Sequence, residues 1–359
     1  MKTNLLTALI LILLFIYSCS NFQEEKIEVK QEHIGKYLEK NVLLITLRNS
    51  NGSVLTLTNY GARITGIVVP DKYGNMDNVA LGFETFEKIL SGSKSAGATI
   101  GRYANRIANG KFTLNNIEYK LNLNNGQNSI HGGPNGWHSV IWDTKINKNS
   151  KRPSVKFSYL SPNMEEGFPG NVKISVTYSW TNNDEIIIDY KYKTDKKTIV
   201  NVTNHTFFNL RGAGNSDVLN HLLLLRASSF TPIDSQMIPT GEIRPVINSP
   251  FDFTTPHTIG ERINEDCEQL TLGFGYDHNF VLDNIEEVDA IIHDPNSGRI
   301  MEVITDQPGI QFYVTKNKSW FCLETSHFPD SPNHPNFPST EITPGVNVKT
   351  KTIYRFTMK

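Results

Sequence analysis

Four short stretches of the chain hold most of the side chains that could carry out chemistry. They gather histidine, carboxylate, arginine and amide groups within a chain of 359 residues whose formal net charge is −1. Taken singly, each has a plain structural explanation, such as a hydrogen-bonded histidine, an Asx turn or a surface ion pair. The stretches are residues 101–107 with 130–133 downstream, residues 204–210, residues 275–280, and Gln311 with residues 322–329.

A histidine and a glutamate in these stretches suggest acid–base chemistry. In a strand, alternate side chains share a face, so His205 would lie beside Phe207, and Cys322 beside Glu324. Apolar neighbours imply that both ionisable groups are partly buried. Burial raises a carboxylate pKa toward neutrality, and the pKa of histidine is already about 6.5. The pair therefore suits proton transfer in both directions at one site.

The motifs of these stretches, taken together, resemble a known family. Gly-Arg-x-Ala-Asn-Arg-Ile, His-Gly-Gly, Asn-His-x-Phe-Phe-Asn-Leu, Tyr-Asp-His-Asn-Phe and Cys-Leu-Glu-Thr occur here in this order. At these spacings they resemble the aldose 1-epimerases, also called galactose mutarotases. The resemblance covers roughly residues 37–359. It implies an all-β fold, the galactose mutarotase-like supersandwich, and an isomerase that interconverts the α and β anomers of free aldohexoses such as galactose and glucose.

The resemblance also assigns roles in ring opening. His205 matches the acid that protonates the ring oxygen of the sugar, and Glu324 the base on the C1 hydroxyl. The C1–C2 bond of the open aldehyde rotates, and the roles reverse on reclosure, so no cofactor is needed. The rate is expected to fall in acid as Glu324 is protonated, and in base as His205 loses its proton.

Six further residues match the family positions that hold the sugar. A guanidinium, an amide and a carboxylate can each form two hydrogen bonds to neighbouring hydroxyls, while an aromatic ring can face the apolar C–H surface. Many relatives have Tyr at the position of Phe207, and many have a longer loop where this chain has only residues 312–323. The substrate-binding candidates are Asn105, Arg106, His131, Phe207, Asp277 and Gln311.

The elements that must position these residues are mostly strands. Period-2 patterns dominate, and Gly and Pro, at 25 and 17 residues, favour frequent turns. Helical periodicity is confined to residues 84–90 and 258–263. We therefore expect a large antiparallel β-sandwich of roughly 20 or more strands. The expected strands include residues 42–48, 53–58, 62–69, 155–159, 172–180, 185–192, 198–203, 279–282, 288–293, 300–305, 310–315, 320–325 and 346–358, with a hairpin turn at 181–184.

The N-terminal residues have the pattern of an export signal. An apolar run at residues 5–16 is too short to span a bilayer permanently but suits a signal peptide. Ser18-Cys19 follows, as in the lipobox of bacterial lipoproteins, although an ordinary cleaved signal with an incidental cysteine remains the alternative. We expect a signal peptide at 1–18, a polar tether at 19–36 after a lipidated Cys19, and one domain at 37–359. This predicts a bacterial lipoprotein anchored in a membrane and facing the periplasm or cell surface.

Other partners are limited by composition. Near-neutral charge, with 35 Lys+Arg against 36 Asp+Glu, argues against nucleic acid. Two distant cysteines, Cys267 and Cys322, favour separate buried thiols over a disulfide. A monomer that binds a small aldose is expected. The many turns leave open a peripheral structural cation, with calcium as the candidate.

Two other classes of protein remain to be weighed. A non-catalytic carbohydrate-binding protein on the same fold would not need both His205 and Glu324. A metal-dependent hydrolase would need closely spaced ligands, but the ten histidines are scattered and form no His-Glu-x-x-His motif.

Overall fold

The computed structural model describes residues 27–359, except for 84, 149–151, 215–216 and 286. The predicted signal peptide at 1–18, Cys19 and the first part of the predicted tether therefore lie outside the described residues. Within the described ranges, no helix is both long and apolar enough to cross a membrane.

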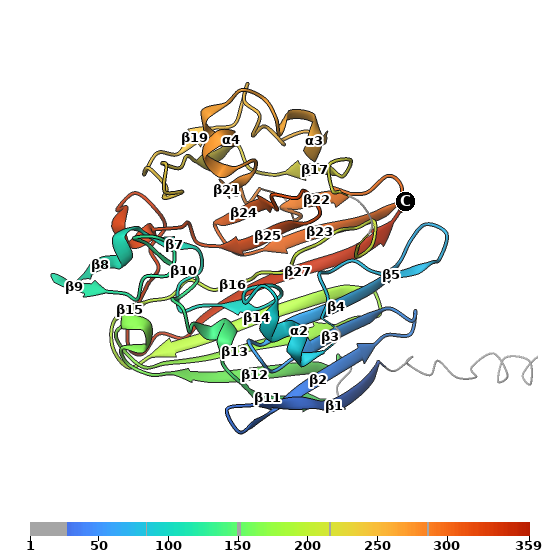
Figure 1. Ribbon diagram of the computed structural model, residues 1–359, viewed down its shortest axis with the longest axis horizontal. Coiled ribbons are helices and arrows are strands. Elements are labelled where there is room, and N and C mark those ends of the chain that lie inside the picture. Colours follow the sequence, from blue (N-terminus) through green and yellow to red (C-terminus); the bar gives the residue numbers. More distant parts are fainter. Residues whose placement is uncertain (1–26, 84, 149–151, 215–216, 286) are drawn as a thin grey trace, which may run out of the picture.

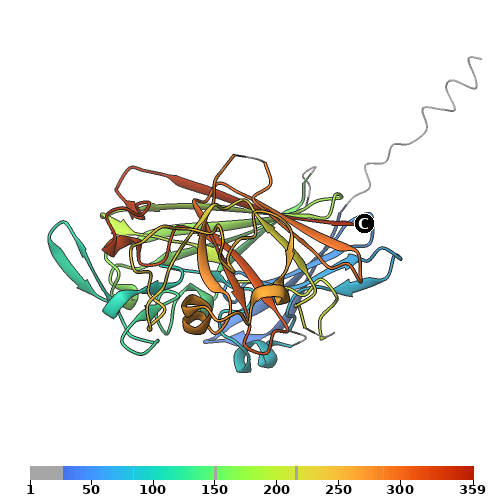
Figure 2. The same cartoon turned by 90° about the horizontal axis from the view of Figure 1, so that it is seen from above.

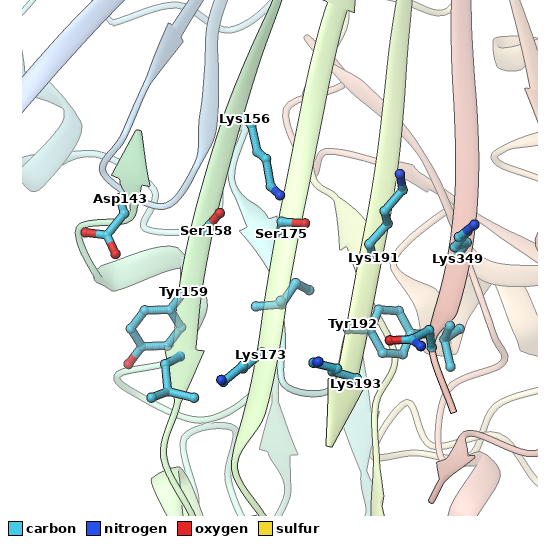
Figure 3. A pocket seen from close by; sticks show the side chains of 14 residues that line it. Asp143, Lys156, Ser158, Tyr159, Lys173, Ser175, Lys191, Tyr192, Lys193 and Lys349 are labelled. Atoms are coloured by element: carbon cyan, nitrogen blue, oxygen red, sulfur yellow. The ribbon is translucent and has the colours of Figure 1, made fainter. Parts of the chain in front are cut away.

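A nine-stranded antiparallel sheet forms one layer of the molecule (Figure 1). Its inner strands are long, and their side chains alternate: β13 places Val172 and Ile174 in the core and Lys173 in solvent. The outward face carries a row of lysines (Figure 3). In spatial order the strands are β11 (Asp143–Asn147), β12 (Ser154–Ser161), β13 (Val172–Trp180), β14 (Glu185–Thr194), β27 (Val348–Met358), β23 (Arg299–Thr305), β22 (Ala290–His293), β17 (Leu222–Leu225) and β20 (His257–Thr258).

Two five-stranded sheets supply the opposing layer, and Figure 2 shows the blue N-terminal strands on one side of the green strands of the large sheet. Both pack against its inner face: the Trp180 indole donates to the Ser53 carbonyl, and the Tyr354 hydroxyl donates to the Leu323 carbonyl. The sheets are β1 (Glu28–Tyr37), β2 (Lys40–Arg48), β3 (Val54–Thr58), β4 (Arg63–Pro70) and β5 (Met76–Asn78), then β19 (Arg244–Pro245), β18 (Ser229–Thr231), β21 (Asp277–Val281), β24 (Gly309–Val314) and β25 (Phe321–Ser326).

Short ladders and turns connect the layers. Four two-stranded pairs are described: β6 (Thr99–Ile100) with β16 (Thr203–Asn204), β7 (Arg106–Ile107) with β10 (Ser129–Ile130), β8 (Lys111–Leu114) with β9 (Ile117–Lys120), and β15 (Thr198–Ile199) with β26 (Glu341–Ile342). The described α-helices are α2 (Phe86–Ser91), α3 (Ile259–Arg262) and α4 (Glu268–Gly273), and single 3-10 turns occur at Ala108–Gly110, Trp137–Ser139, Glu165–Gly167 and Ser331–Asn333.

The all-β sandwich expected from the sequence is confirmed, and many strand boundaries agree. The strand at residues 172–180 is found as predicted, with the hairpin turn at 181–184 leading into β14. The prediction of a single strand at 198–203 is wrong, because the backbone changes its pairing partner within this segment. Thr198 and Ile199 pair with β26, whereas Thr203 pairs with β6. Helix α4 (Glu268–Gly273) was not expected from the sequence.

The tether expected to reach residue 36 is also corrected. Residues 28–37 form β1, which pairs with β2 along its whole length at the edge of the N-terminal sheet. Ile27 is buried, and Val29, Ile34 and Tyr37 pack against core clusters. The segment looked polar because most side chains of β1 are exposed to solvent.

Candidate active site

Most of the predicted site residues meet at one cavity of about 400 Å³. This volume is typical of a pocket for a small organic molecule. The cavity is lined by residues of β21, β24 and β25, by Arg106 and Ile130 of the β7–β10 ladder, and by loop residues, including those that follow β10 and β16. The predicted residues that line it are Asn105, Arg106, His131, His205, Phe207, Asp277 and Glu324.

Sheet register brings the acidic groups together. Glu324 on β25 lies opposite Gln311 on β24. Two residues further along β24, Tyr313 lies opposite Asp277 on β21. His205 directly follows β16. Its backbone is fixed by two hydrogen bonds, from its own N–H to the Ala98 carbonyl and from the Gly97 N–H to its carbonyl. The histidine therefore reaches the glutamate from a separate, rigid element.

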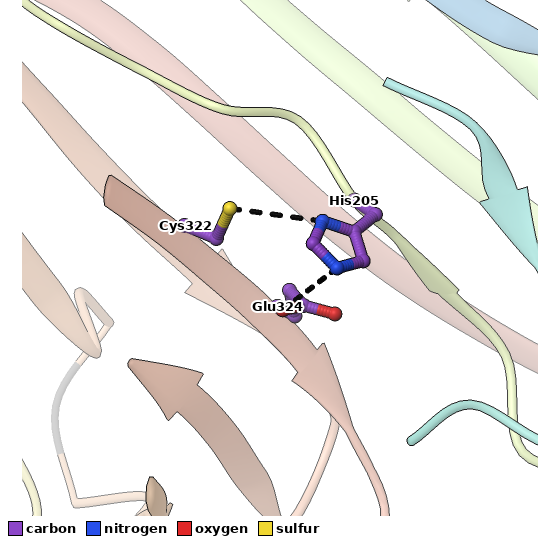
Figure 4. A group of neighbouring side chains, drawn as sticks. All are labelled: His205, Cys322 and Glu324. Atoms are coloured by element: carbon purple, nitrogen blue, oxygen red, sulfur yellow. Dashed lines mark hydrogen bonds and ion pairs between the residues drawn. The ribbon is translucent and has the colours of Figure 1, made fainter. Parts of the chain in front are cut away.

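His205 and Glu324 form a close pair, shown in Figure 4. The distance from His205 Nε2 to Glu324 Oε1 is 3.5 Å, and both side chains are about 95% buried, with exposures of 6% and 5%. On the other side of the ring, Cys322 Sγ lies 3.6 Å from His205 Nδ1. Both nitrogens of the imidazole thus face a polar neighbour, and the ring and the carboxyl group lie side by side at the cavity.

Burial moves the two pKa values in opposite directions. Desolvation lowers the pKa of His205 to about 4, and the buried Arg63 guanidinium adds to this effect. Desolvation raises the pKa of Glu324 well above its ordinary value; Asp277 adds to the rise and Arg106 opposes it. Both shifts favour the uncharged groups, imidazole and carboxylic acid. The lowered pKa of His205 departs from the ordinary value that the sequence suggested, because the imidazole is almost completely buried.

A polar cluster forms another wall of the cavity. Arg106 Nη2 lies 4.0 Å from Asp277 Oδ2, and Arg106 Nε donates to Asn125 Oδ1 at 3.1 Å. Gln311 Nε2 donates to Asp277 Oδ1 at 2.6 Å. Burial raises the pKa of Asp277, against the effects of Arg106 and the Gln311 hydrogen bond. Gln311 is the one predicted site residue that does not line the cavity; it lies opposite Glu324 in the sheet and donates to the Asp277 carboxyl group.

His131 enters the cavity from a left-handed turn. Its φ is 55°, and the next residue, Gly132, has φ of 80° and packs so closely that a Cβ would lie 2.1 Å from the Gly101 carbonyl oxygen. The Asn105 N–H donates to His131 Nδ1 at 3.2 Å. Burial is the main cause that holds the pKa of His131 well below its usual value, and the neighbouring His205, His138 and Arg106 side chains also lower it. The neutral ring therefore carries its proton on Nε2, which makes that atom a hydrogen-bond donor.

Aromatic rings pack around the histidine. The Phe207 ring stacks on the His205 imidazole, with centroids 4.9 Å apart and planes 21° apart, and Tyr313 packs edge-on against Phe207 at 6.1 Å. At the rim, Lys316 Nζ lies 4.1 Å from the centre of the exposed Phe274 ring. Phe207 thus both lines the cavity and restrains the plane of the imidazole.

Several residues that line the cavity were not predicted. Tyr313 had a detectable signal, since it shares a strand face with Gln311 by period 2. The others come mostly from loops, with Ile130 in β10, Val314 in β24 and Gly273 in α4, and carry no local pattern that marks them. They are Ser93, Ser95, Asn125, Ile130, Met237, Gly273, Phe274, Val314 and Lys316. The short segment at residues 312–323 is a tight hairpin between β24 and β25, and Lys316 from its turn reaches the rim.

The structure bears on two further predictions, the state of the cysteines and the presence of a bound cation. Cys267 and Cys322 are both free, as predicted, but Cys267 is only half-buried, because it precedes the exposed helix α4. In the described part of the chain, His205, Cys322 and Glu324 form a group whose ligand atoms lie within 4.8 Å of one another. Two of these three, His205 and Glu324, are the residues predicted to transfer protons. The peripheral calcium stays a prediction, which elemental analysis of purified protein would test.

Comparison with known proteins agrees with this geometry. The family model described as aldose 1-epimerase matches residues 43–355. The chain is 39% identical to galactose mutarotase of Bos taurus, with 84% of this chain and 90% of that protein covered. It is 34% identical to aldose 1-epimerase of Escherichia coli K12, with 87% and 94% covered.

A solved structure shares the fold as well. The galactose 1-epimerase from Lactobacillus acidophilus NCFM superposes with a TM-score of 0.84 at 25% identity, covering 93% of this chain and 99% of that one. A family match over most of the chain, and relatives above 30% identity over most of their length, settle the classification. The chain belongs to the aldose 1-epimerase family.

Proposed function

We propose that the protein is an aldose 1-epimerase that interconverts the α and β anomers of free aldohexoses such as galactose and glucose. The relatives named above support the reaction. The observation that carries the mechanism is the 3.5 Å contact between His205 and Glu324 in a cavity of about 400 Å³. A binding protein would have no need of two acid–base groups in contact.

The protonation of the pair suits a reaction without net proton uptake. An uncharged imidazole beside a carboxylic acid holds the same number of protons as an imidazolium beside a carboxylate. Transfer of one proton from Glu324 to His205 therefore produces the acid and the base that ring opening needs. His205 then protonates the ring oxygen while Glu324 takes the proton of the C1 hydroxyl, and the roles reverse on reclosure. The residues return to their starting state, so no cofactor is required.

The other residues of the cavity hold the sugar in this proposal. Arg106 and Asp277 present a guanidinium and a carboxyl group side by side, suited to neighbouring hydroxyls. His131 donates through Nε2, and Asn105 lies next to it. Gln311 orients the Asp277 carboxyl group through its amide N–H, and its Oε1, which has no partner among the described residues, is left to accept from a sugar hydroxyl. Phe207 offers an apolar edge without the hydroxyl that a tyrosine would add.

Polarimetry tests the activity. Freshly dissolved α-D-galactose and α-D-glucose are followed with and without purified protein. We expect the optical rotation to reach equilibrium faster with the protein, in proportion to its concentration. If no aldose is accelerated while sugar still binds in calorimetry, the non-catalytic carbohydrate-binding alternative replaces this proposal.

We also propose that the protein is a bacterial lipoprotein anchored through Cys19 and exposed to the periplasm or cell surface. The support is the apolar run at residues 5–16 that ends at Ser18-Cys19. Changing Cys19 to Ala should move the protein from the membrane fraction to the soluble extract. An unchanged membrane fraction would contradict the anchor, and release of both forms would indicate an ordinary cleaved signal.

The catalytic unit is proposed to be a monomer. All the groups that the mechanism uses come from one chain and meet in one cavity. Light scattering after gel filtration should give the mass of one chain, and a dimer at assay concentrations would contradict the proposal.

A further inference from the structure

A second recess lies on the outer face of the nine-stranded sheet, away from the active site (Figure 3). Its volume is about 660 Å³, and it crosses β12, β13, β14 and β27. An adjoining recess of about 340 Å³ shares Lys173, Lys193 and Asn347 with it, so the two form one extended depression. We call this depression the lysine groove; the lysines that line it are Lys156, Lys173, Lys191, Lys193 and Lys349.

The groove follows from side-chain length and strand register. Ser158 and Ser175 lie opposite each other on β12 and β13, and these short side chains form the floor. Longer side chains surround them, including Lys156, Lys191 and the exposed Leu160. Since neighbouring strands are about 4.8 Å apart, the four strands span roughly 14 Å. The floor offers hydroxyls, and the walls offer ammonium groups.

Lysines lie opposite one another across the strands of the groove. Lys173 lies directly opposite Lys193, and Lys191 directly opposite Lys349. A third pair, Lys145 opposite Lys156, lies at its margin. Like charges directly opposite each other destabilise a sheet.

Few carboxylates accompany these lysines. Among the described residues, no carboxylate lies within 4.0 Å of the ammonium groups of the five groove lysines. Asp143 lines one end of the groove, and Asp195 lines the adjoining recess, where it accepts hydrogen bonds from Asn171. In a chain of net charge −1, this is a local excess of positive charge.

We propose that the lysine groove binds a chain of an acidic polysaccharide, with carboxylate or sulfate groups on the lysines and sugar hydroxyls over the serine floor. A flat lipid surface would meet protruding side chains and would not reach a recessed serine floor. A second copy of this chain, packed face to face, would bring lysines against lysines. Nucleic acid would favour exposed aromatic rings for stacking, whereas the rings of Tyr159 and Tyr192, which border the groove, pack toward the core.

The groove is separate from the active site. On β27 the residues facing inward, such as Thr352 and Tyr354, bond to β25, while Lys349 lies on the opposite face of the strand. Replacing groove lysines should therefore leave mutarotation unchanged, and polysaccharide binding can be tested whatever the outcome for the proposed epimerase activity.

Titration calorimetry at low and at physiological salt tests the proposal. The probes are heparin oligosaccharides for sulfate, polygalacturonate oligomers for carboxylate, and a neutral maltooligosaccharide of similar length. We expect one or both acidic glycans to bind the unaltered protein, more weakly as salt rises, and the neutral one not to bind. The triple variant Lys173→Gln, Lys191→Gln, Lys193→Gln should bind roughly 10- to 100-fold more weakly at low salt, with a smaller dependence on salt.

A matched triple variant separates the effect of losing lysines in the groove from the effect of lowering the net charge of the protein. Lys36→Gln, Lys40→Gln and Lys120→Gln remove the same charge at exposed sites elsewhere, and should leave binding near that of the unaltered protein. Equal loss in both triple variants would overturn the proposal. So would failure of both acidic glycans to bind, or binding to phosphatidylglycerol vesicles without binding to either glycan. Circular dichroism and unchanged mutarotation confirm that each variant is folded.

Discussion

The active-site cavity and the lysine groove use charged side chains in opposite ways. In the cavity, His205 and Glu324 are almost fully enclosed, and burial shifts their pKa values toward the uncharged forms. In the groove, five exposed lysines remain unpaired by any carboxylate within 4.0 Å in the described chain. Enclosure allows a proton to be exchanged between two fixed groups, whereas exposure leaves a permanent field that attracts anions and is screened by salt.

The difference indicates how each region should respond to change. The cavity depends on the geometry of single atoms, so isosteric substitutions there should have large effects. The groove depends on summed charge, so single substitutions should have small effects on binding and can even stabilise the fold.

The largest effect is expected at the proton-transfer pair. His205→Asn and Glu324→Gln keep size and hydrogen bonding but remove the ability to exchange a proton at the required atom. Each should lower kcat by about 10²- to 10⁴-fold. The double variant should lose far less than the product of the single losses, because ring opening needs both groups. Polarimetry on folded variants measures this, and a single variant with near-normal kcat would remove that residue from the chemistry.

A smaller effect is expected at Arg106. Its guanidinium lies beside Asp277 and is assigned to sugar hydroxyls, not to proton transfer. Arg106→Ala should lower kcat/KM by roughly 10- to 100-fold, mainly through KM, as for loss of a hydrogen bond from a charged group. Arg106→Lys should restore only part of this, because an ammonium lacks the planar fork. Initial rates over a range of galactose concentrations separate KM from kcat; unchanged KM in the alanine variant would exclude contact with sugar.

We expect kcat/KM to be constant over a plateau of pH and to fall by about tenfold per pH unit on either side of it. The pKa of His205 is lowered to about 4, and that of Glu324 is raised. Below pH 4 the pair gains a second proton and loses its base; above the raised pKa of Glu324 it loses its only transferable proton. The acid limb therefore belongs to His205 and the alkaline limb to Glu324, the reverse of the assignment expected from the sequence.

A variant at Asp277 tests that assignment. The charge of Asp277 contributes to the raised pKa of Glu324, so Asp277→Asn should move the alkaline limb to lower pH and leave the acid limb in place. Movement of the acid limb alone would contradict the assignment. Limbs at the ordinary pKa values of the two residues would show that the pair is not enclosed as described.

The smallest effect is expected in the groove, where a substitution should increase the stability of the fold. Lys173→Thr removes a like-charge pair with Lys193 and places a β-branched residue in the strand β13. The variant should be more stable by about 0.2–1 kcal/mol in urea unfolding. Lys40→Thr, at the start of β2, serves as the control and should change stability less. A loss of stability at Lys173 would indicate that Lys173 forms favourable contacts on its sheet face.

Sequence patterns predicted the fold more completely than the site environment. Period-2 alternation located β13 and its neighbours because each strand has one buried face. It could not show that the segment at 198–203 divides between two partners, since pairing is not local. The polar composition of residues 28–36 concealed an edge strand for another reason: most side chains of β1 are exposed and none is fully buried, so the segment has no clear apolar face.

The motifs identified the residues of the site but not the pKa values of their side chains. Seven of the eight predicted catalytic and binding residues line the cavity, and Gln311 is hydrogen-bonded to one of them, Asp277. The low pKa of His205 depends on enclosure by elements far apart in the sequence, including the distant Arg63. The groove had no sequence signal, because Lys173, Lys193 and Lys349 become neighbours only through strand register.

The position of β27 has a consequence for how the chain folds during synthesis. This strand follows all the other described strands in the chain, yet it lies between β14 and β23 in the middle of the nine-stranded sheet. Until it emerges from the ribosome, the two halves of the sheet have nothing to join them, and each presents an open edge to other nascent chains. β25, which carries Glu324, also lacks its support from Tyr354 until then. Catalytic competence should therefore appear late and abruptly during translation, when β27 inserts.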